Sequence, residues 1–451
     1  MNIKQRLITA LFSISVVALP VVLVAQVIDN DFKNNQPKEN SPFSRLGFGN
    51  YAPTTLTAMQ SMGGISAGFR DGDLLNFQNP ASFGFLRQAT YEAAFYGKNT
   101  ILTGRNTTSS SWSGNLAYLA LGFHTRNPIN EVLDKKENPL SWGMGFQLLP
   151  YNSVGYNVSV ETKLQPQDSV SITTFHLGSG GTYKAAFATG LAYKGFALGA
   201  SAGYLFGKMN LDRQIQFTNL PYATPNLLSD EYAVRGVFGQ LGVQYDIILD
   251  KAPEIRQKRH LVLGASVQPG FDFTTTATQF YRRRSYTVTD TLRYVADIEG
   301  KGRMPTEYNI GFMYEKAGLF RLGADYSASD WSAYKNAAKS DVLYDTYKFA
   351  AGLEYIQDAA SYKSYRKRIR YRLGFSTGTD PRKLGGEQLK QYAVTAGMGF
   401  PIIMPREQTS YMHLALEYGK LYNSTLAEES VRITVGFTLN DNTWFLKRKY
   451  Q

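Results

Sequence analysis

The sequence contains no cysteine and only four histidines among its 451 residues. The absence of cysteine excludes disulfide scaffolds, thiolate metal sites and cysteine nucleophiles. The mean hydropathy of −0.27 excludes a helical transporter, which needs several apolar runs of about 20 residues. Glycine and aromatic residues are abundant instead, with 41 Gly, 30 Tyr and 27 Phe. This composition favours a large β protein over a helical bundle, and no residue pattern indicates a cofactor or a metal.

Residues 1–25 have the pattern of a secretory signal peptide. Lys4 and Arg6 form a basic start, residues 7–23 are almost wholly apolar, and Ala25 is a small residue at a plausible cleavage point. No later segment has the apolar length of a transmembrane helix. The pattern therefore predicts an exported protein that is either soluble outside the inner membrane or a transmembrane barrel.

Beyond the first 90 residues, large apolar residues alternate with small or polar residues in long segments. In 346–356, for example, Phe349 and Leu353 point one way while Lys348 and Glu354 point the other. Such segments run about 9 to 11 residues, which is typical of membrane barrel strands with a lipid-facing band. A soluble sandwich normally uses strands of about 5 or 6 residues. The side chains predicted to face lipid include Tyr347, Phe349, Leu353, Val394, Met398, Leu414, Val435 and Phe437.

The alternating segments predict an all-β fold, a 14-stranded antiparallel transmembrane β-barrel over residues 90–439. The predicted strands are 90–98, 114–125, 141–162, 170–193, 196–209, 233–249, 260–280, 290–314, 319–329, 346–356, 369–377, 390–400, 411–420 and 430–439. The connections 210–232, 328–345 and 377–389 are predicted to be long outer loops. Segment 276–303 has two interpretations, one long hairpin above the membrane or an extra pair of strands.

Residues 26–89 do not follow this alternation. Segment 26–41 is polar and is predicted to be a flexible periplasmic tail. Segment 42–89 is rich in apolar residues but broken by glycine and proline, so it needs burial without forming strands. The wide lumen of a 14-stranded barrel needs filling, which predicts an N-terminal hatch, or plug, inside the lumen. A separate periplasmic domain is the alternative. Residues 440–451 are predicted to form a basic periplasmic C-terminal tail.

Three motifs occur in order in this N-terminal part of the chain: Ser41-Pro42-Phe43-Ser44-Arg45-Leu46-Gly47, Met62-Gly63-Gly64 and Asn79-Pro80-Ala81. Together with the C-terminal segment 444–450, they resemble the FadL-type outer-membrane transport family (OMPP1/FadL/TodX-like), particularly its Bacteroidota members. The resemblance spans essentially the mature chain. It implies a plugged 14-stranded barrel that passes hydrophobic molecules, such as long-chain fatty acids, sideways through the barrel wall.

Two groups of hatch residues are candidate functional residues. Asn79, Pro80 and Ala81 suit a sharp turn, because asparagine hydrogen-bonds nearby backbone and proline biases the preceding residue away from helix. The hatch also supplies the aromatic surface that a lipid-like chain would need. The predicted apolar ligand path comprises Phe43, Phe48, Phe77, Phe83 and Phe85. The alternative is that these phenylalanines only attach the plug to the wall.

The family also has a kink in the third strand that makes a lateral opening, and Pro150 falls in the third predicted strand. Proline removes a hydrogen bond from the strand ladder wherever it occurs. Pro150, Tyr151 and Asn152 are therefore the candidate lateral-opening kink. Alternatively, Pro150 ends the membrane-embedded part of the strand.

Three functions compete on the sequence. The first is passive uptake of a hydrophobic small molecule, without a cofactor or a nucleotide. The second is a non-transporting barrel that serves as a subunit or scaffold of an outer-membrane protein secretion or assembly complex. The third, a hydrolase using His124 or His413 in the lumen, lacks any accompanying nucleophile motif, so we predict no enzyme. The expected partners are outer-membrane lipid, lipopolysaccharide, a hydrophobic ligand and other envelope proteins, but not nucleic acid.

Overall fold

The computed structural model describes residues 39–104, 108–125, 139–163, 171–217, 220, 223–250, 258–284, 288–403 and 408–441. The predicted signal peptide, most of the predicted N-terminal tail and the basic residues near the C-terminus lie outside these ranges. None of the helices formed by the described residues is long and apolar enough to cross a membrane.

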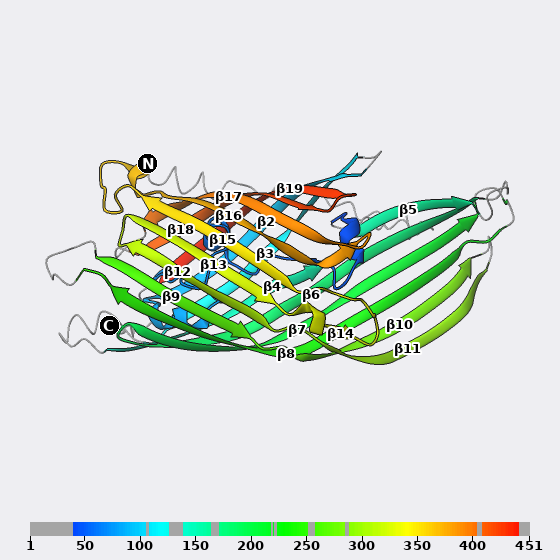
Figure 1. Ribbon diagram of the computed structural model, residues 1–451, viewed down its shortest axis with the longest axis horizontal. Helices are drawn as coiled ribbons and strands as arrows, with labels where there is room; N and C mark the ends of the chain where they lie inside the picture. The colour runs from blue at the N-terminus through cyan, green and yellow to red at the C-terminus, as the bar shows by residue number, and fades with distance from the viewer. Residues whose placement is uncertain are drawn as a thin grey trace, which may run out of the picture. The chain divides into compact units, whose positions relative to one another are not determined.

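The described chain is almost entirely β-structure (Figure 1). The short elements are η1 (Pro42–Arg45), β1 (Asn50–Tyr51), α3 (Thr57–Gln60), η2 (Pro80–Phe85), η3 (Trp331–Ala333), β14 (Lys335–Asn336) and η4 (Tyr365–Arg368). The long strands are β2 (Ala89–Thr103), β3 (Thr108–His124), β4 (Leu140–Ser153), β5 (Tyr156–Lys163), β6 (Ser171–Tyr193), β7 (Phe196–Phe217), β8 (Asn226–Ile248), β9 (Arg259–Gln268), β10 (Asp272–Arg284), β11 (Thr289–Arg303), β12 (Glu307–Lys316), β13 (Phe320–Ser329), β15 (Thr346–Ile356), β16 (Arg370–Leu384), β17 (Glu387–Ile403), β18 (Thr409–Tyr422) and β19 (Ala427–Asp441).

Within the described residues these strands close into one antiparallel barrel of 14 strands, because three wall strands are each divided in two. β4 and β5 both pair with β6, and β9 and β10 both pair with β8. β12 and β11 in turn pair with β9 and β10. The barrel closes where β19 pairs with β2. The predicted fold is confirmed, and 276–303 is one long hairpin of β10 and β11.

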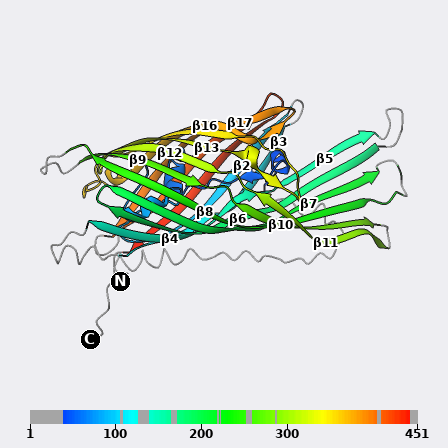
Figure 2. The same cartoon turned by 60° about the horizontal axis from the view of Figure 1, so that its bottom comes forward.

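The two ends of the barrel differ in character. Ala89 pairs with Asp441, so the first and last wall strands meet their termini at one end, which is periplasmic in bacterial barrels. At the opposite, outer end, β5 to β8, β10 and β11 extend as long hairpins (Figures 1 and 2). The predicted outer loops 210–232 and 377–389 are therefore wrong. β7 continues to Phe217, and β16 and β17 meet at Gly385-Gly386. Strand pairing continues beyond the apolar band, where the alternation that marks a strand fades.

The outward face of the barrel carries the apolar side chains. Tyr347, Phe349 and Leu353 on β15 are exposed, whereas Glu354 on the same strand is 1% exposed. Val394 and Met398 on β17, Leu414 on β18 and Phe437 on β19 are likewise exposed, and Val435 is half-buried. The predicted lipid-facing set therefore points outward. An antiparallel β-barrel with such an outward apolar band is typical of the bacterial outer membrane.

This placement makes a testable prediction for Leu373, a β16 residue that is 59% exposed on the outward face. We expect Leu373→Arg to lower the free energy of unfolding in lipid vesicles by about 2–4 kcal/mol, because the charge enters the apolar band. Thr346→Lys, which adds a charge next to Lys348 on the inward face, is the control and should cost much less. Equal losses in urea titrations of the two variants would contradict the assignment of the faces.

Candidate functional site

The N-terminal segment 39–88, here called the plug segment, packs against inward-facing positions of the wall (Figures 1 and 2). Gly143, Gly190, Gly199 and Gly242 pair with one another in register across β4, β6, β7 and β8. A Cβ added to any of them would lie 2.2–2.4 Å from an atom of the stretch 79–83. This row of wall glycines therefore makes the space in which the plug segment lies.

Asn79 fixes the plug segment in place. Its side-chain amide donates to the carbonyl oxygens of Ala67 at 2.8 Å, Val243 at 3.1 Å and Ala265 at 3.3 Å, the last two on β8 and β9. Its Oδ1 accepts from the backbone N–H of Ala81 at 3.2 Å, which caps η2. The Asn79-Pro80-Ala81 motif thus connects the plug segment to two wall strands.

A consecutive pair of plug residues makes ion pairs with different strands. Arg70 reaches Asp246 on β8 at 2.5 Å, and Asp71 accepts from Arg321 on β13 at 2.7 Å and from Arg370 on β16 at 2.9 Å. Burial raises the pKa of Asp71, but the two guanidinium groups outweigh it and hold that pKa well below its usual range. The ionised Asp71 carboxylate therefore ties the plug segment to the wall at its periplasmic side.

A second charged group holds the outer part of the plug segment. Arg382 on β16 is 3% exposed and pairs with Asp380 at 2.7 Å. The same guanidinium donates to the carbonyl oxygen of Phe43 at 2.9 Å, the carbonyl oxygen of Gly49 at 3.2 Å and Oδ1 of Asn50 at 2.6 Å. One wall arginine therefore satisfies acceptors along η1 and β1.

The wall is incomplete next to β4. β3 pairs with β4 only from Leu119↔Leu148 to His124↔Gly143, so within the described residues β3 above Leu119 has no partner on that side. The β3 and β5 ribbons diverge toward the outer end (Figures 1 and 2). A β-bulge lies between Pro150 and Asn152. The bulge lets the side chains of Tyr151 and Asn152 both lie buried, where Asn152 accepts from the backbone N–H of Thr182 at 2.6 Å.

The plug segment occupies the β4 side of this gap. Asn50 and Tyr51 pair with Ser153 and Asn152, and the backbone N–H of Ser41 donates to the carbonyl oxygen of Gly155 at 2.8 Å. Residues 39–41, the end of the predicted periplasmic tail, lie here in the outer half rather than at the periplasmic end. The chain itself therefore supplies the neighbour that β3 does not provide.

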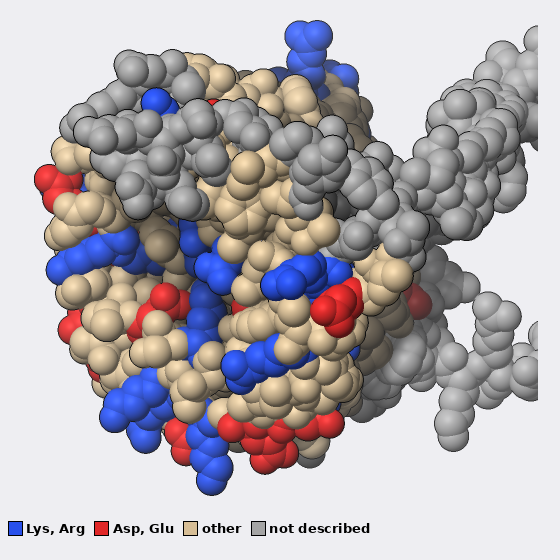
Figure 3. All heavy atoms as spheres, turned by 90° about the vertical axis from the view of Figure 1, so that its right-hand side faces the viewer, with Lys and Arg blue, Asp and Glu red and all other residues tan. Residues whose placement is uncertain are grey.

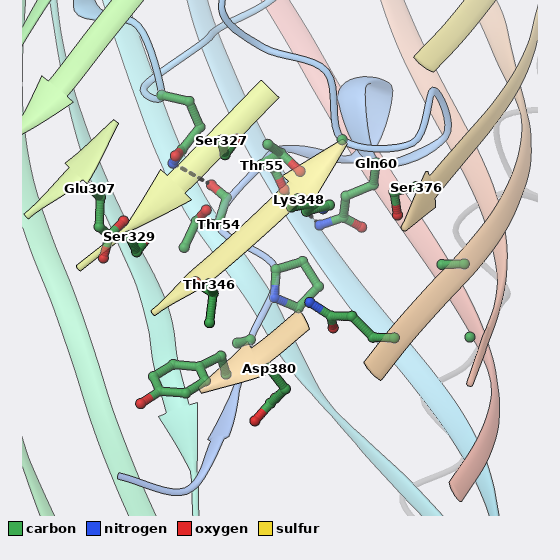
Figure 4. A pocket seen from close by; sticks show the side chains of 18 of the residues that line it. Thr54, Thr55, Gln60, Glu307, Ser327, Ser329, Thr346, Lys348, Ser376 and Asp380 are labelled. Atoms are coloured by element: carbon green, nitrogen blue, oxygen red, sulfur yellow. Dashed lines mark hydrogen bonds between the residues drawn. The ribbon is translucent and has the colours of Figure 1, made fainter. Parts of the chain in front are cut away.

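A cavity of about 450 Å³ lies inside the barrel between the plug segment and the wall (Figure 4). Its lining is mainly hydroxyl and amide side chains, and Figure 4 shows Ser327, Ser329, Thr346 and Ser376 on the wall side with Thr54 on the plug side. The outer end of the molecule carries many Lys and Arg side chains (Figure 3). The cavity lining is therefore only slightly more polar than apolar, with hydroxyl, amide and charged groups beside aromatic rings.

An apolar hollow of about 460 Å³ lies on the outward face where β2, β3, β4 and β19 meet. Its lining residues are Tyr91, Glu92, Ala93, Leu119, Ala120, Leu121, Phe146, Gln147, Leu148, Phe437 and Leu439. Gln147 lines both this hollow and the internal cavity, and its Oε1 is buried without a hydrogen-bond partner among the described residues. Gln147 therefore separates the two spaces at the level where β3 leaves β4.

The phenylalanines predicted to line a ligand path lie in apolar clusters. Phe77 and Phe83 are 2% exposed with ring centroids 4.9 Å apart, and Phe48 packs against Phe273 and Tyr334. Phe43 is buried, and Phe85 is half-buried under the guanidinium of Arg70. The lining of the internal cavity includes none of these five phenylalanines. Tyr151 of the predicted kink does line it, 4.0 Å from Lys184 Nζ to its ring centroid.

Comparisons with known proteins agree with this architecture. The family model for BamG matches residues 18–451. The solved structure of the toluene transporter TbuX from Ralstonia pickettii is 14% identical, with a TM-score of 0.53 over 87% of this chain and 98% of its own. The toluene transporter TodX from Pseudomonas putida is 15% identical, with a TM-score of 0.51 over 87% of this chain and 99% of its own. No curated protein matches the sequence. The two structures share the fold of this chain, which is the fold that its motifs imply.

Proposed function

We propose that this chain, which belongs to the BamG family, is an outer-membrane barrel that passes hydrophobic small molecules, such as fatty acid-like compounds, passively out through its side. The observation that carries the proposal is the incomplete pairing of β3 with β4. A strand pair that separates within a barrel wall leaves no backbone ladder to close it, so a ligand can leave toward lipid there.

The proposed route runs from the internal cavity, past Gln147, into the apolar hollow on the outward face. Gln147 is the residue that lines both spaces, and its side-chain Oε1 has no hydrogen-bond partner among the described residues. In this proposal segment 42–89 acts as the hatch, and the bulge at Pro150, Tyr151 and Asn152 keeps the outer part of β4 away from β3. The hatch phenylalanines attach the hatch to the wall beside the route.

Blocking the route at Gln147 tests this function. We expect Gln147→Trp to reduce uptake of a radiolabelled hydrophobic compound by cells about tenfold, because the indole fills the passage between cavity and hollow. Gln147→Ala should leave uptake unchanged or raise it. Gln279→Ala is the matched control and should behave as the wild type, because Gln279 on β10 also has an unpaired Oε1 among the described residues but lines neither space. Equal uptake by all variants and by a deletion strain would refute transport.

The contacts between the plug segment and the barrel wall support a second function. The plug segment lies against wall glycines, is ion-paired through Arg70 and Asp71, and covers the β4 side of the gap. A barrel whose plug segment is fixed in this way suits a non-transporting subunit or scaffold of an outer-membrane assembly complex, whose partners are other envelope proteins. Purification from native membranes in mild detergent tests it: a stoichiometric protein partner, together with unchanged uptake in the deletion strain, would favour the scaffold.

A further inference from the structure

Resting on the proposed transport function, we infer that the ligand is an amphiphile with an uncharged, polyhydroxylated headgroup. The headgroup lies in the internal cavity and a single alkyl chain extends past Gln147 into the outer hollow. Alkyl glycosides represent this chemical class. The inference separates this chain's ligand from a plain hydrocarbon and from a free fatty acid.

The first argument is the hydroxyl groups of the cavity wall. Ser329 on β13 and Thr346 on β15 are direct cross-strand partners, and Ser376 follows on β16 (Figure 4). Within the described part of the chain, these three hydroxyls have no hydrogen-bond partner, and the Oγ of Ser327 donates to Asn309 Oδ1 at 3.0 Å. A hydrocarbon that displaced water here would leave these groups unpaired, which is costly. A sugar ring offers both donors and acceptors to such a wall.

The second argument is that half of the charged side chains lining the cavity already form ion pairs with other side chains. Lys184 donates to Gln268 Oε1 at 3.1 Å and lies over the Tyr151 ring, and Lys348 and Glu417, of opposite charge, line the same cavity. Among the described residues, the ion pairs that include cavity residues are Lys98–Glu428 at 3.7 Å, Arg382–Asp380 at 2.7 Å and Lys420–Glu429 at 2.8 Å. A carboxylate headgroup would have to compete with these partners, whereas a neutral headgroup would not.

The third argument is the arrangement of the two spaces. The polar cavity and the apolar hollow have similar volumes, about 450 and 460 Å³, and meet at Gln147. Leu119, Phe146 and Leu148 give the hollow an apolar surface that faces lipid. A molecule with one polar and one apolar end can occupy both at once, while its chain stays in contact with apolar side chains.

Equilibrium dialysis of the full-length mature protein in phosphatidylcholine nanodiscs tests the inference. The labelled probes are octyl glucoside, octylbenzene, octanoate and glucose, each kept below its aggregation concentration. We expect octyl glucoside to bind at least about tenfold more tightly than the other three. Ser329→Ala with Thr346→Val should weaken octyl glucoside binding about tenfold and leave octylbenzene binding unchanged, because only the headgroup contacts are removed. Ser332→Ala, in η3 outside the cavity lining, is the matched control.

The outcomes distinguish this inference from the function on which it rests. Binding of octylbenzene with no preference for octyl glucoside would overturn the inference and leave transport of hydrophobic compounds standing. Preferential binding of octanoate would overturn it in favour of an anionic amphiphile. Binding of glucose as tightly as octyl glucoside would remove the role of the hollow. Absence of binding by every probe would overturn both the inference and the transport function.

Discussion

Replacing Gly199 by alanine should displace the plug segment from the wall. A Cβ at this β7 position would lie 2.2 Å from the carbonyl carbon of Pro80 and 2.3 Å from the backbone nitrogen of Ala81. Backbone atoms cannot swing aside as a flexible side chain can, and Asn79 fixes this backbone to β8 and β9. We expect a loss of about 1–3 kcal/mol in the free energy of unfolding, the usual cost of overpacking, and more for Gly199→Val.

The readout is specific to the plug segment. Limited proteolysis of the detergent-solubilised barrel should cut residues 39–88 of the Gly199→Ala variant at least about tenfold faster than in the wild type, because the displaced segment opens locally. Gly239→Ala on the neighbouring strand β8 is the matched control, since the nearest atom to its added Cβ is Ser201 O at 3.7 Å. Wild-type cleavage rates in both variants would mean that the wall glycines do not position the plug segment.

The sequence predicts the barrel wall well, because one face of each strand contacts lipid and every second residue is therefore apolar. The segment predicted at 390–400 lies inside β17, and its outward residues Val394 and Met398 are exposed. The alternation does not predict the break at Met304-Pro305-Thr306. The predicted strand 290–314 crosses this point, whereas β11 ends before it and β12 begins after it. β11 and β12 together form one strand of the wall. The break between them changes which strand each part pairs with, but it leaves the alternation of side chains within each part intact.

The candidate site was harder to predict, because it depends on register. Gly143, Gly190, Gly199 and Gly242 are far apart in the sequence, yet they form one line once the strands pair. Gln147 likewise is an inward position of an alternating segment, and nothing near it in the sequence shows that β3 turns away at Leu119. The Asn79-Pro80-Ala81 motif identifies Asn79 because part of its role is local: it caps η2, in addition to its hydrogen bonds to distant wall strands.

Replacing Asp71 by asparagine should destabilise the protein most strongly among single polar substitutions in the plug segment. The change keeps the shape of the side chain but removes the charge that faces Arg321 and Arg370. Among the described residues, Arg321 then keeps only two carboxylate partners, Glu315 at 3.1 Å and Glu354 at 3.2 Å. Breaking a buried ion pair in this way typically costs about 3–5 kcal/mol, because a desolvated charge loses its partner.

Urea titration of the refolded barrel measures this loss, with Glu231→Gln as the control. Glu231 forms a pair with Lys208 at 2.6 Å in which both side chains are well exposed, so its removal should cost about 1 kcal/mol or less. Comparable losses in the two variants would show that the Asp71 cluster is solvated and does not hold the plug segment.

The pH dependence of the Asp71→Asn effect gives an independent check, and its sign follows from the lowered pKa. A carboxyl group whose pKa is lower in the folded state than in the unfolded chain stabilises the protein above the unfolded pKa, near 4 for aspartate. That contribution is lost as the pH falls below this value, because the unfolded chain takes up the proton first. The difference between wild type and Asp71→Asn should therefore be constant from about pH 6 to 8 and shrink below about pH 4. A difference that grew in acid would mean that Asp71 is protonated in the folded barrel and holds the plug segment by hydrogen bonds rather than by charge.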